Sequence, residues 1–251
     1  MKGFIILGLG ASSILSAQTD STQIKEMQGV SLTRRLPVSK EIINVQKDLG
    51  SKNLGQDLPI LLKNQMSVVA TSDAGNGVGY TGFRIRGSAG TSINVMLNGV
   101  PYNDSESQGT FFVNIPDMAS SASQIVIQRG VGTSSNGTAS FGASVNILTK
   151  NPDEKPYVLG QFSAGSFNTM KTSFEAGSGK FLNNLLSVSA RYSTINSDGY
   201  IDRAFSKLNS YNINALFEKG NTKLRFLTFG GKEKTYQAWN GIDRQTWETN
   251  P

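Results

Sequence analysis

The fold is decided by a stretch in which apolar and polar side chains alternate strictly: Leu186-Ser187-Val188-Ser189-Ala190-Arg191-Tyr192-Ser193. Successive side chains of a β-strand point to opposite faces, so this stretch predicts a strand with one apolar and one polar face. The same alternation recurs within residues 158–164, 170–176, 211–218 and 224–228. We therefore expect about five consecutive antiparallel strands of about ten residues each over residues 151–251.

Segments rich in glycine and asparagine separate these strands and predict the turns between them. They are residues 165–168, 177–180 and 219–221. A longer connection, residues 196–207, follows the third strand. Because short turns join antiparallel strands, consecutive strands are expected to be antiparallel.

The length of the alternating segments distinguishes two kinds of sheet. Strands of a soluble sandwich are typically about 5–6 residues long, whereas a strand that crosses a bilayer needs about 9–11. A transmembrane strand presents an apolar row to lipid and a polar row to the lumen. Length favours membrane strands, and a soluble sandwich is the alternative.

The first 17 residues have the order of a secretory signal. Lys2 supplies the positive flank, residues 4–15 form a short apolar run, and Ala17 is a small residue before Gln18. The run is shorter than the roughly 20 residues that a membrane helix needs. We therefore expect a signal peptide over residues 1–17, and a buried N-terminal strand or helix is the alternative.

Composition excludes several classes of site. The chain has no His and no Cys, which removes Ser-His-Asp triads, imidazole catalysis, thiol nucleophiles, disulfides and metal sites built on those ligands. We expect no enzyme activity, no metal site and no cofactor. Lys and Arg number 24 against 18 Asp and Glu, a net charge of +6, but the basic residues are dispersed, so nucleic acid is not an expected partner.

Two segments lie between the signal and the alternating strands. Residues 18–36 are polar and aperiodic, which is typical of a flexible arm. Residues 37–150 combine short apolar strands with a helix near residues 54–62, where Pro59 stands close to the first turn. Asn98-Gly99 predicts a tight turn after a strand at 93–97. Residues 37–150 are therefore expected to form a compact domain that mixes α and β structure.

Several motifs in residues 34–150 carry a family resemblance when they are taken in order. They are Leu54-Gly55-Gln56-Asp57-Leu58-Pro59-Ile60-Leu61-Leu62, Phe83-Arg84-Ile85-Arg86-Gly87, Val95-Met96-Leu97-Asn98-Gly99-Val100-Pro101, Ile125-Val126-Ile127-Gln128-Arg129-Gly130 and Phe141-Gly142-Ala143-Ser144-Val145-Asn146-Ile147-Leu148-Thr149-Lys150. In this order they resemble the plug domain of TonB-dependent outer-membrane receptors, and the strands after them resemble the start of that family's barrel. Val126, Val131 and Ala143 depart from the usual pattern.

The resemblance implies an α+β plug domain, residues 37–150, followed by antiparallel transmembrane β-barrel strands, residues 151–251, from an incomplete barrel of about 22 strands. It implies a receptor in the outer membrane of a Gram-negative cell that contacts outer-membrane lipid. That receptor takes up a small extracellular ligand of the siderophore, haem, cobalamin or glycan type, with energy supplied through the partner protein TonB. Five strands cannot close such a barrel, so we expect a fragment of a longer receptor.

The resemblance also nominates residues for three roles. A TonB box, which adds a strand to a sheet edge of TonB, is expected at Glu26, Met27, Gly29, Val30 and Ser31. Arg86 and Arg129 match plug arginines that pair with barrel glutamates, on later strands or at Glu175. Ligand contacts are expected on apical plug loops, at Asn76, Tyr80, Tyr102, Asp104, Glu106 and Phe111.

Each role has an ordinary structural alternative. The box is alternatively a plain linker, the arginines are strand residues that face interior water, and the loops are periplasmic turns or packing against the barrel wall. The rival function for the chain is that of a secreted or surface-attached β-rich binding or adhesion protein, in which the alternating strands form a sandwich.

Overall fold

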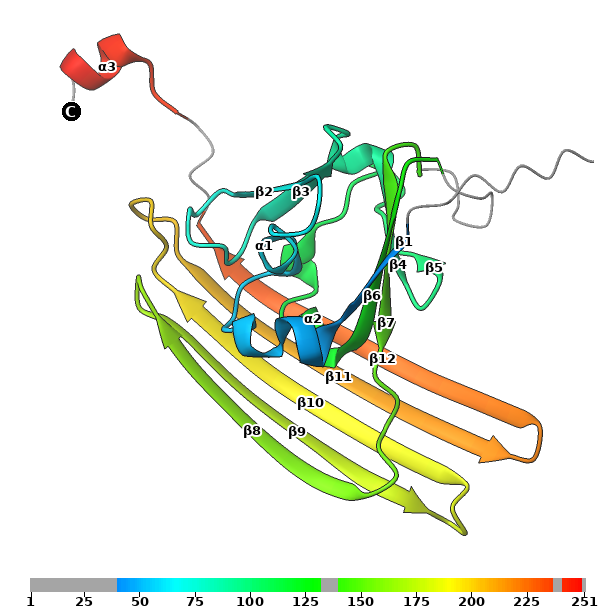
Figure 1. Ribbon diagram of the computed structural model, residues 1–251. Coiled ribbons are helices and arrows are strands. Elements are labelled where there is room, and N and C mark those ends of the chain that lie inside the picture. Colours follow the sequence, from blue (N-terminus) through cyan, green and yellow to red (C-terminus); the bar gives the residue numbers. More distant parts are fainter. Residues whose placement is uncertain (1–39, 132–139, 237–240, 250–251) are drawn as a thin grey trace, which may run out of the picture. The chain divides into compact units, whose positions relative to one another are not determined.

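The computed structural model describes residues 40–131, 140–236 and 241–249 (Figure 1). All of them belong to one compact unit, Pro37–Pro251. The expected signal peptide, the arm and the candidate TonB box lie outside the described residues. The described strands form two five-stranded sheets and one two-stranded sheet.

The first five-stranded sheet belongs to an N-terminal domain, which we define as residues 40–149. Its strand order is β1-β6-β7-β4-β5. All neighbours in it are antiparallel except β4 and β7, which are parallel. The strands are β1 (Lys40–Asn44), β4 (Ile93–Leu97), β5 (Val100–Pro101), β6 (Ala122–Arg129) and β7 (Ala143–Thr149).

A second, two-stranded sheet and several short helices complete this domain. The sheet pairs β2 (Val68–Ser72) with β3 (Thr81–Ile85) in antiparallel fashion. The helices are η1 (Val45–Leu49), η2 (Gly50–Lys52), α1 (Leu58–Leu61), η3 (Gly90–Ser92), η4 (Phe112–Asn114) and α2 (Met118–Ser121). None of the helices in the described part of the chain has the length and apolar character needed to cross a bilayer.

Local sequence signals explain parts of this domain. Pro59 lies in the first turn of α1, where its missing N–H leaves no helical hydrogen bond unmade. Asn98 and Gly99 adopt positive φ angles of 52° and 84° between β4 and β5, as a two-residue hairpin turn requires. A continuous apolar core, which includes Ile93, Ile125 and Val145, then joins the two sheets.

The second five-stranded sheet is a meander of long antiparallel strands in the order β12-β11-β10-β9-β8, and we call it the wall sheet. Its strands contain 10 to 14 residues each, which confirms the expected series of consecutive antiparallel strands. They are β8 (Pro156–Gly165), β9 (Thr169–Phe181), β10 (Leu186–Ser197), β11 (Ser206–Lys219) and β12 (Thr222–Thr235). A short helix, α3 (Arg244–Thr249), follows further along the chain.

One predicted turn is wrong. Residues 177–180 were expected to end a strand, but β9 continues to Phe181 and the turn falls at residues 182–185. The glycines form a bulge instead, because Gly177 pairs with Ser189 and Lys180 pairs with Ser187, which leaves one extra residue on β9. The connection expected at residues 196–207 is shorter, since β10 ends at Ser197 and β11 begins at Ser206.

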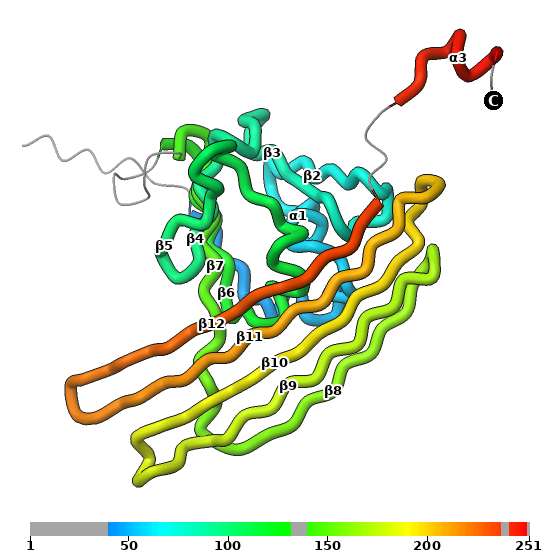
Figure 2. Tube along the Cα trace, turned by 180° about the vertical axis from the view of Figure 1, so that it is seen from behind, coloured from blue at the N-terminus to red at the C-terminus, as the bar shows by residue number. Residues whose placement is uncertain are grey.

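The wall sheet has two distinct ends. The apical end carries the turn at residues 166–168 and the connection at 198–205, and the basal end carries the turns at 182–185 and 220–221. The N-terminal domain lies against one face of the wall sheet, as the two opposite views show (Figures 1 and 2). The chain passes from β7 to β8 at the basal end.

Candidate functional site: the interface between the N-terminal domain and the wall sheet

The wall sheet buries its polar face and exposes its apolar face. Lys171 and Arg191, on the face toward the N-terminal domain, are only 1% and 5% exposed. On the opposite face Val158 is 84% exposed and Phe174 is 62% exposed. Other side chains follow the same division, with Ser173, Ser193, Ser210, Asn212 and Asn214 buried and Phe162, Tyr192, Tyr211, Leu224 and Phe226 exposed. This burial is the reverse of a soluble sandwich, in which apolar rows pack face to face.

Asp117 is the centre of the interface. Lys171 Nζ lies 2.6 Å from its Oδ1, and Arg191 Nη1 lies 2.8 Å from its Oδ2. The hydroxyl of Ser120 donates to Oδ1 at 2.6 Å, and that of Ser193 donates to Oδ2 at 2.8 Å. The carboxylate is buried and each of its oxygens accepts two hydrogen bonds, so its charge is compensated on both sides.

The short helix α2 presents Asp117 and a second layer of hydroxyls to the wall sheet. Asp117 precedes the helix with φ 53°, in the left-handed region that aspartate adopts more readily than most residues. Ser120 Oγ also accepts from Lys171 Nζ at 2.9 Å and from Asn53 Nδ2 at 2.9 Å. Arg191 Nε donates to Ser121 Oγ at 2.7 Å. Asp117 and the hydroxyls of α2 therefore provide acceptors for both cations.

Two opposing effects set the pKa of Asp117. Burial disfavours the charged carboxylate and raises the pKa. Attraction to Arg191 and Lys171, with hydrogen bonds from Lys171 and Ser120, outweighs burial and holds the pKa below its ordinary value. Asp117 is therefore ionised at neutral pH.

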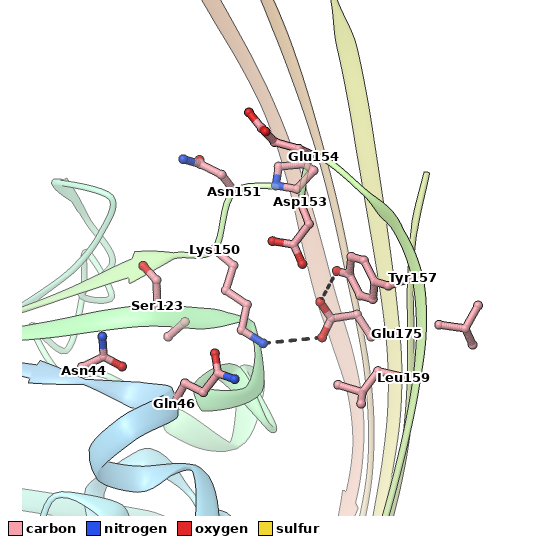
Figure 3. Close-up of a pocket in the computed structure, with 13 residues that line it drawn as sticks. Asn44, Gln46, Ser123, Lys150, Asn151, Asp153, Glu154, Tyr157, Leu159 and Glu175 are labelled. Atoms are coloured by element: carbon pink, nitrogen blue, oxygen red, sulfur yellow. Dashed lines mark hydrogen bonds and ion pairs between the residues drawn. The ribbon is translucent and has the colours of Figure 1, made fainter. Parts of the chain in front are cut away.

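A polar cleft of about 620 Å³ opens at the basal end between the N-terminal domain and β8 (Figure 3). Glu175 projects into it and accepts a hydrogen bond from Tyr157 Oη at 2.6 Å. Lys150 Nζ lies 3.6 Å from Glu175 Oε2. The lining also includes Asn44, Gln46, Ser123, Asn151, Asp153 and Glu154. Within the described ranges, no cluster of three or more acidic side chains is placed to hold a metal ion.

A second cleft, of about 310 Å³, lies at the apical end. The glycine-rich loop of residues 73–79 forms one side, and the turn at 166–168 forms the other. Asn76 Nδ2 donates to Ser197 Oγ across this region. The backbone N–H of Tyr200 donates to Ala74 O at 2.8 Å, so the loop is joined directly to an apical connection of the wall sheet. Gly75 packs against the Tyr200 ring, where a Cβ would come within 2.9 Å of Cδ1.

A family model described as the TonB-dependent Receptor Plug Domain matches residues 33–144. The chain carries this plug domain. The N-terminal domain described above is therefore the plug, and the wall sheet consists of antiparallel strands that resemble those of TonB-dependent receptor barrels.

Solved structures show the same fold across the plug and the wall sheet. The ferric yersiniabactin uptake receptor FyuA from Yersinia pestis matches with a TM-score of 0.62 at 15% identity, covering 80% of this chain and 32% of the receptor. The pyoverdine outer membrane receptor FpvA from Pseudomonas aeruginosa matches with a TM-score of 0.61 at 14% identity, covering 78% of this chain and 28% of the receptor. The copper transporter OprC matches with a TM-score of 0.65 at 13% identity, covering 79% and 32%.

The chain spans about a third of the length of these solved structures. Their low identities establish the fold alone. A search of curated protein sequences found no significant match.

The plug arginines nominated from sequence lie apart from the Asp117 contacts. Arg129 is buried in the plug, where it forms an ion pair with Glu41 of β1 and donates from Nε to Met66 O at 3.0 Å. Arg86 follows β3 with φ 52° and is exposed. Glu175, a suggested partner, contacts Lys150 and Tyr157 instead. The pairing of these arginines with barrel glutamates stays a prediction.

The six nominated ligand residues fall into two groups. Asn76 and Tyr80 lie at the apical end, where Tyr80 Oη donates to Glu233 Oε1 at 3.3 Å. The other four, Tyr102, Asp104, Glu106 and Phe111, belong to the loop after β5.

In that loop, Asp104 forms hydrogen bonds within the loop itself, and Tyr102 packs against the wall sheet. The Tyr102 ring packs against Phe229 of β12 at 6.1 Å between centroids, and burial raises the pKa of its hydroxyl. Asp104 accepts hydrogen bonds from the Ser107 N–H, the Ser107 hydroxyl and the Glu106 N–H, which lower the pKa of its carboxyl. Glu106 and Phe111 are exposed. Of the six, only Asn76 lines the apical cleft, whereas Tyr80 contacts Glu233 near the apical end of β12.

Sequence reasoning missed the interface around Asp117. Lys171 and Arg191 stood in the polar rows of two predicted strands, which was a usable signal that both cations share one face. Asp117 gave no comparable signal, because it follows Pro116 in an aperiodic segment. Its role depends on contacts with Lys171 and Arg191, which follow Asp117 in the sequence by 54 and 74 positions.

Proposed function

We propose that this chain is part of a TonB-dependent transporter of the outer membrane, and not an enzyme. The observation that carries the proposal is the wall sheet, whose polar face lies against the plug while its apolar face is exposed. A strand that crosses a bilayer must direct apolar side chains to lipid and polar side chains to the lumen. The plug then occupies the lumen of a wide barrel, which leaves an open channel unless it is filled.

The outer face of the wall sheet has the character expected of a lipid contact. Its exposed side chains include Val158, Phe162, Phe174, Leu224 and Phe226. An apolar patch of this extent on a soluble monomer favours association. In a bilayer the same patch is buried without further protein, so outer-membrane lipid is the proposed partner of this face.

The apical end is the proposed entrance for the ligand. Asn76 and Tyr80 of the plug meet the wall sheet there, next to a cleft that opens between the plug and an apical turn. The similar solved structures include a ferric yersiniabactin receptor, a pyoverdine receptor and a copper transporter. We propose a small extracellular ligand of the siderophore, haem, cobalamin or glycan type for this chain.

The proposed energy source is TonB. For this chain we propose that the candidate box at Glu26, Met27, Gly29, Val30 and Ser31 pairs with TonB as an added strand. We also propose that residues 1–17 are the export signal.

Fractionation and uptake test the proposal together. The full-length gene product should sediment with outer membranes and resist extraction by alkaline carbonate, whereas recovery in the soluble fraction supports the secreted binding or adhesion protein. A deletion strain should lose growth under one of three limitations: iron, cobalamin or glycan. A growth defect that plasmid-borne protein restores identifies the ligand class, and normal growth under all three limitations contradicts the proposed ligand classes.

A matched pair of variants isolates the role of TonB. Replacing residues 26–31 by a Gly-Ser segment of equal length should abolish uptake and leave the amount of protein in the membrane unchanged. The same replacement at residues 18–23 keeps the arm length and the candidate box, so it should support uptake. Equal uptake by both variants argues against the box.

A further inference from the structure

We propose that the wall sheet carries its own binding site for a carboxylate, formed by Lys171, Arg191 and Ser193. Asp117 of the plug fills this site in the present structure. A carboxylate of the transported ligand takes its place when the plug segment moves away from the wall sheet. The inference rests on the proposed uptake, because a moving plug is what uncovers the site.

Three of the four groups that hold Asp117 belong to the wall sheet. Lys171 Nζ, on β9, lies 2.6 Å from Oδ1. Arg191 Nη1 and Ser193 Oγ, both on β10, lie 2.8 Å from Oδ2. Only the fourth donor, Ser120, travels with the plug. The site therefore persists when the plug segment leaves, because its donors are fixed by strand pairing between β9 and β10.

The arrangement of these donors suits a carboxylate. One oxygen is held by an ammonium group and the other by a guanidinium and a hydroxyl, so both oxygens receive charge-assisted hydrogen bonds. Arg191 and Ser193 share a face because they are two residues apart on one strand. A planar anion with two oxygens can reproduce every wall contact that Asp117 makes.

Charge balance gives the site a reason to bind an anion. Two buried cations of the wall sheet share a single carboxylate from the plug. Glu175, the cross-strand partner of Arg191, is engaged by Lys150 and by the Tyr157 hydroxyl. Departure of Asp117 therefore leaves both cations without their main counterion. The repulsion between these two neighbouring cations is then no longer offset, and an incoming carboxylate offsets it again.

A single cysteine can report whether the plug segment covers the wall sheet. Ser210 of β11 is buried, and its hydroxyl has no hydrogen-bond partner among the described residues. Its cross-strand partner, Gly231, lies against Pro116 and Asn114, directly before Asp117. Residues 1–251 contain no cysteine, so Ser210→Cys adds a nearly isosteric label site among them, and the full-length gene product without this change gives the background labelling. The rate of maleimide labelling at position 210 then measures how often the segment leaves.

The test is chemical rescue by acetate in the full-length gene product, held in outer-membrane vesicles. In the Ser210→Cys background, Asp117→Ala should raise the labelling rate at least about tenfold, because both cations lose their partner. Sodium acetate should then lower the rate at least about threefold, while sodium chloride at the same ionic strength should not, because acetate held by the three wall donors also accepts a hydrogen bond from the Ser120 hydroxyl of the plug and therefore favours the covered state.

Two controls separate a specific site from general salt effects. Asp117→Asn removes the charge but keeps the side-chain volume, so labelling should rise and acetate should have no effect. Asp117→Ala combined with Lys171→Met should also lose the response to acetate. A response of equal size in either control overturns the proposal, as does acetate that acts no better than chloride on Asp117→Ala.

If Asp117→Ala does not accumulate in membranes, its refolding yield into detergent is the readout. Acetate must then raise the yield at least about threefold over chloride, and equal yields reject the site. Failure of the proposed function is recognised separately, because it shows as absent uptake and does not change the acetate response.

Discussion

In the plug sheet most of the buried side chains are apolar, such as Ile93, Ile125 and Val145, whereas in the wall sheet most are polar, such as Lys171, Ser173 and Arg191. Both sheets have five strands, and in both the successive side chains of a strand point to opposite faces. The plug folds around its own apolar core, while the wall sheet turns its polar row to the plug. Alternation of side chains therefore specifies two faces of a sheet, and the surface that packs against the sheet decides which face is buried.

Two buried aspartates show the same difference at the level of single groups. Asp117 faces the wall sheet, where two cations lower the pKa of its carboxyl despite burial. Asp57, before α1, is buried with a hydrogen bond from the Thr81 hydroxyl at 3.0 Å, and its Oδ1 lacks a partner among the described residues. Burial raises the pKa of Asp57 to about 8.

The largest effect we predict is a pH dependence of opposite sign at these two acids. Between its ordinary pKa of 3.8 and about 8, Asp57 holds a proton only in the folded state. The free energy of unfolding should therefore fall as pH rises through this window, by up to about 1.4 kcal/mol per pH unit. Asp57→Asn should remove this slope, as measured by urea unfolding of the detergent-solubilised full-length gene product.

Asp117→Asn serves as the contrasting variant. The lowered pKa of Asp117 contributes stability above the ordinary aspartate pKa, and that stability is lost as pH falls through the folded pKa. Asp117→Asn should therefore weaken the loss of stability in acid and leave the slope between pH 5 and about 8 in place. If both variants change the pH dependence of the free energy of unfolding in the same way, the opposite pKa shifts of Asp57 and Asp117 are contradicted.

Truncation of one apolar side chain in each sheet should lower the free energy of unfolding by different amounts. Ile127→Ala in β6 removes a fully buried side chain from the plug core and should lower the free energy of unfolding by about 2–5 kcal/mol. Val158→Ala in β8 truncates an exposed side chain of the wall sheet and should change the free energy of unfolding by less than about 0.5 kcal/mol. Similar losses in calorimetry of the two variants show that the outer face of the wall sheet is packed against protein.

A charged side chain on the outer face of the wall sheet tests whether that face meets lipid or water. Phe174 lies in the middle of β9 and is exposed. Phe174→Arg should destabilise the membrane-inserted protein by about 2–4 kcal/mol and reduce the amount recovered in outer membranes. Phe174→Leu keeps the apolar character and should insert normally. Normal insertion of the arginine variant indicates that this face meets water.

The smallest predicted effect concerns glycines that lie beneath aromatic rings of the wall sheet. Gly230 pairs across strands with Tyr211, and a Cβ at Gly230 would lie 2.8 Å from the ring. Gly230→Ala should therefore destabilise the protein by about 1–3 kcal/mol. Gly160→Ala in β8 is the matched control and should be nearly neutral, because Gly160 pairs across strands with Phe174 and a Cβ would lie 3.6 Å from that ring, an ordinary van der Waals distance. The effect at Gly230 should shrink in a Tyr211→Ala background, and an unchanged effect contradicts direct contact.

Several elements were predictable because their signals are local. Pro59 marked the first turn of α1, Asn98-Gly99 marked the hairpin after β4, and the alternating rows marked the wall strands. The turn expected at residues 177–180 was wrong because a glycine-rich segment is compatible with a turn and with a bulge. Pairing with Ser187 and Ser189 decides between them, and that pairing is a property of the neighbouring strand.

The candidate site was less predictable than the fold. Arg129 was visible as a motif residue, but its ion pair with Glu41 joins strands that are distant in sequence and adjacent in the sheet. The loop after β5 offered carboxylates and aromatics that suggested ligand contacts. In the structure Asp104 stabilises its own turn and Tyr102 packs on β12.

By itself, the amino-acid sequence determined that the chain has a mixed α and β domain followed by long two-faced strands, because turn residues and the period of two act within a few neighbours. It also determined which side chains share a face of the wall sheet. Only the tertiary structure decided that the polar face is the buried one and that Asp117 stands between Lys171 and Arg191. The physical reason is that burial and ion pairing depend on which distant surface covers a strand, and no local pattern encodes that surface.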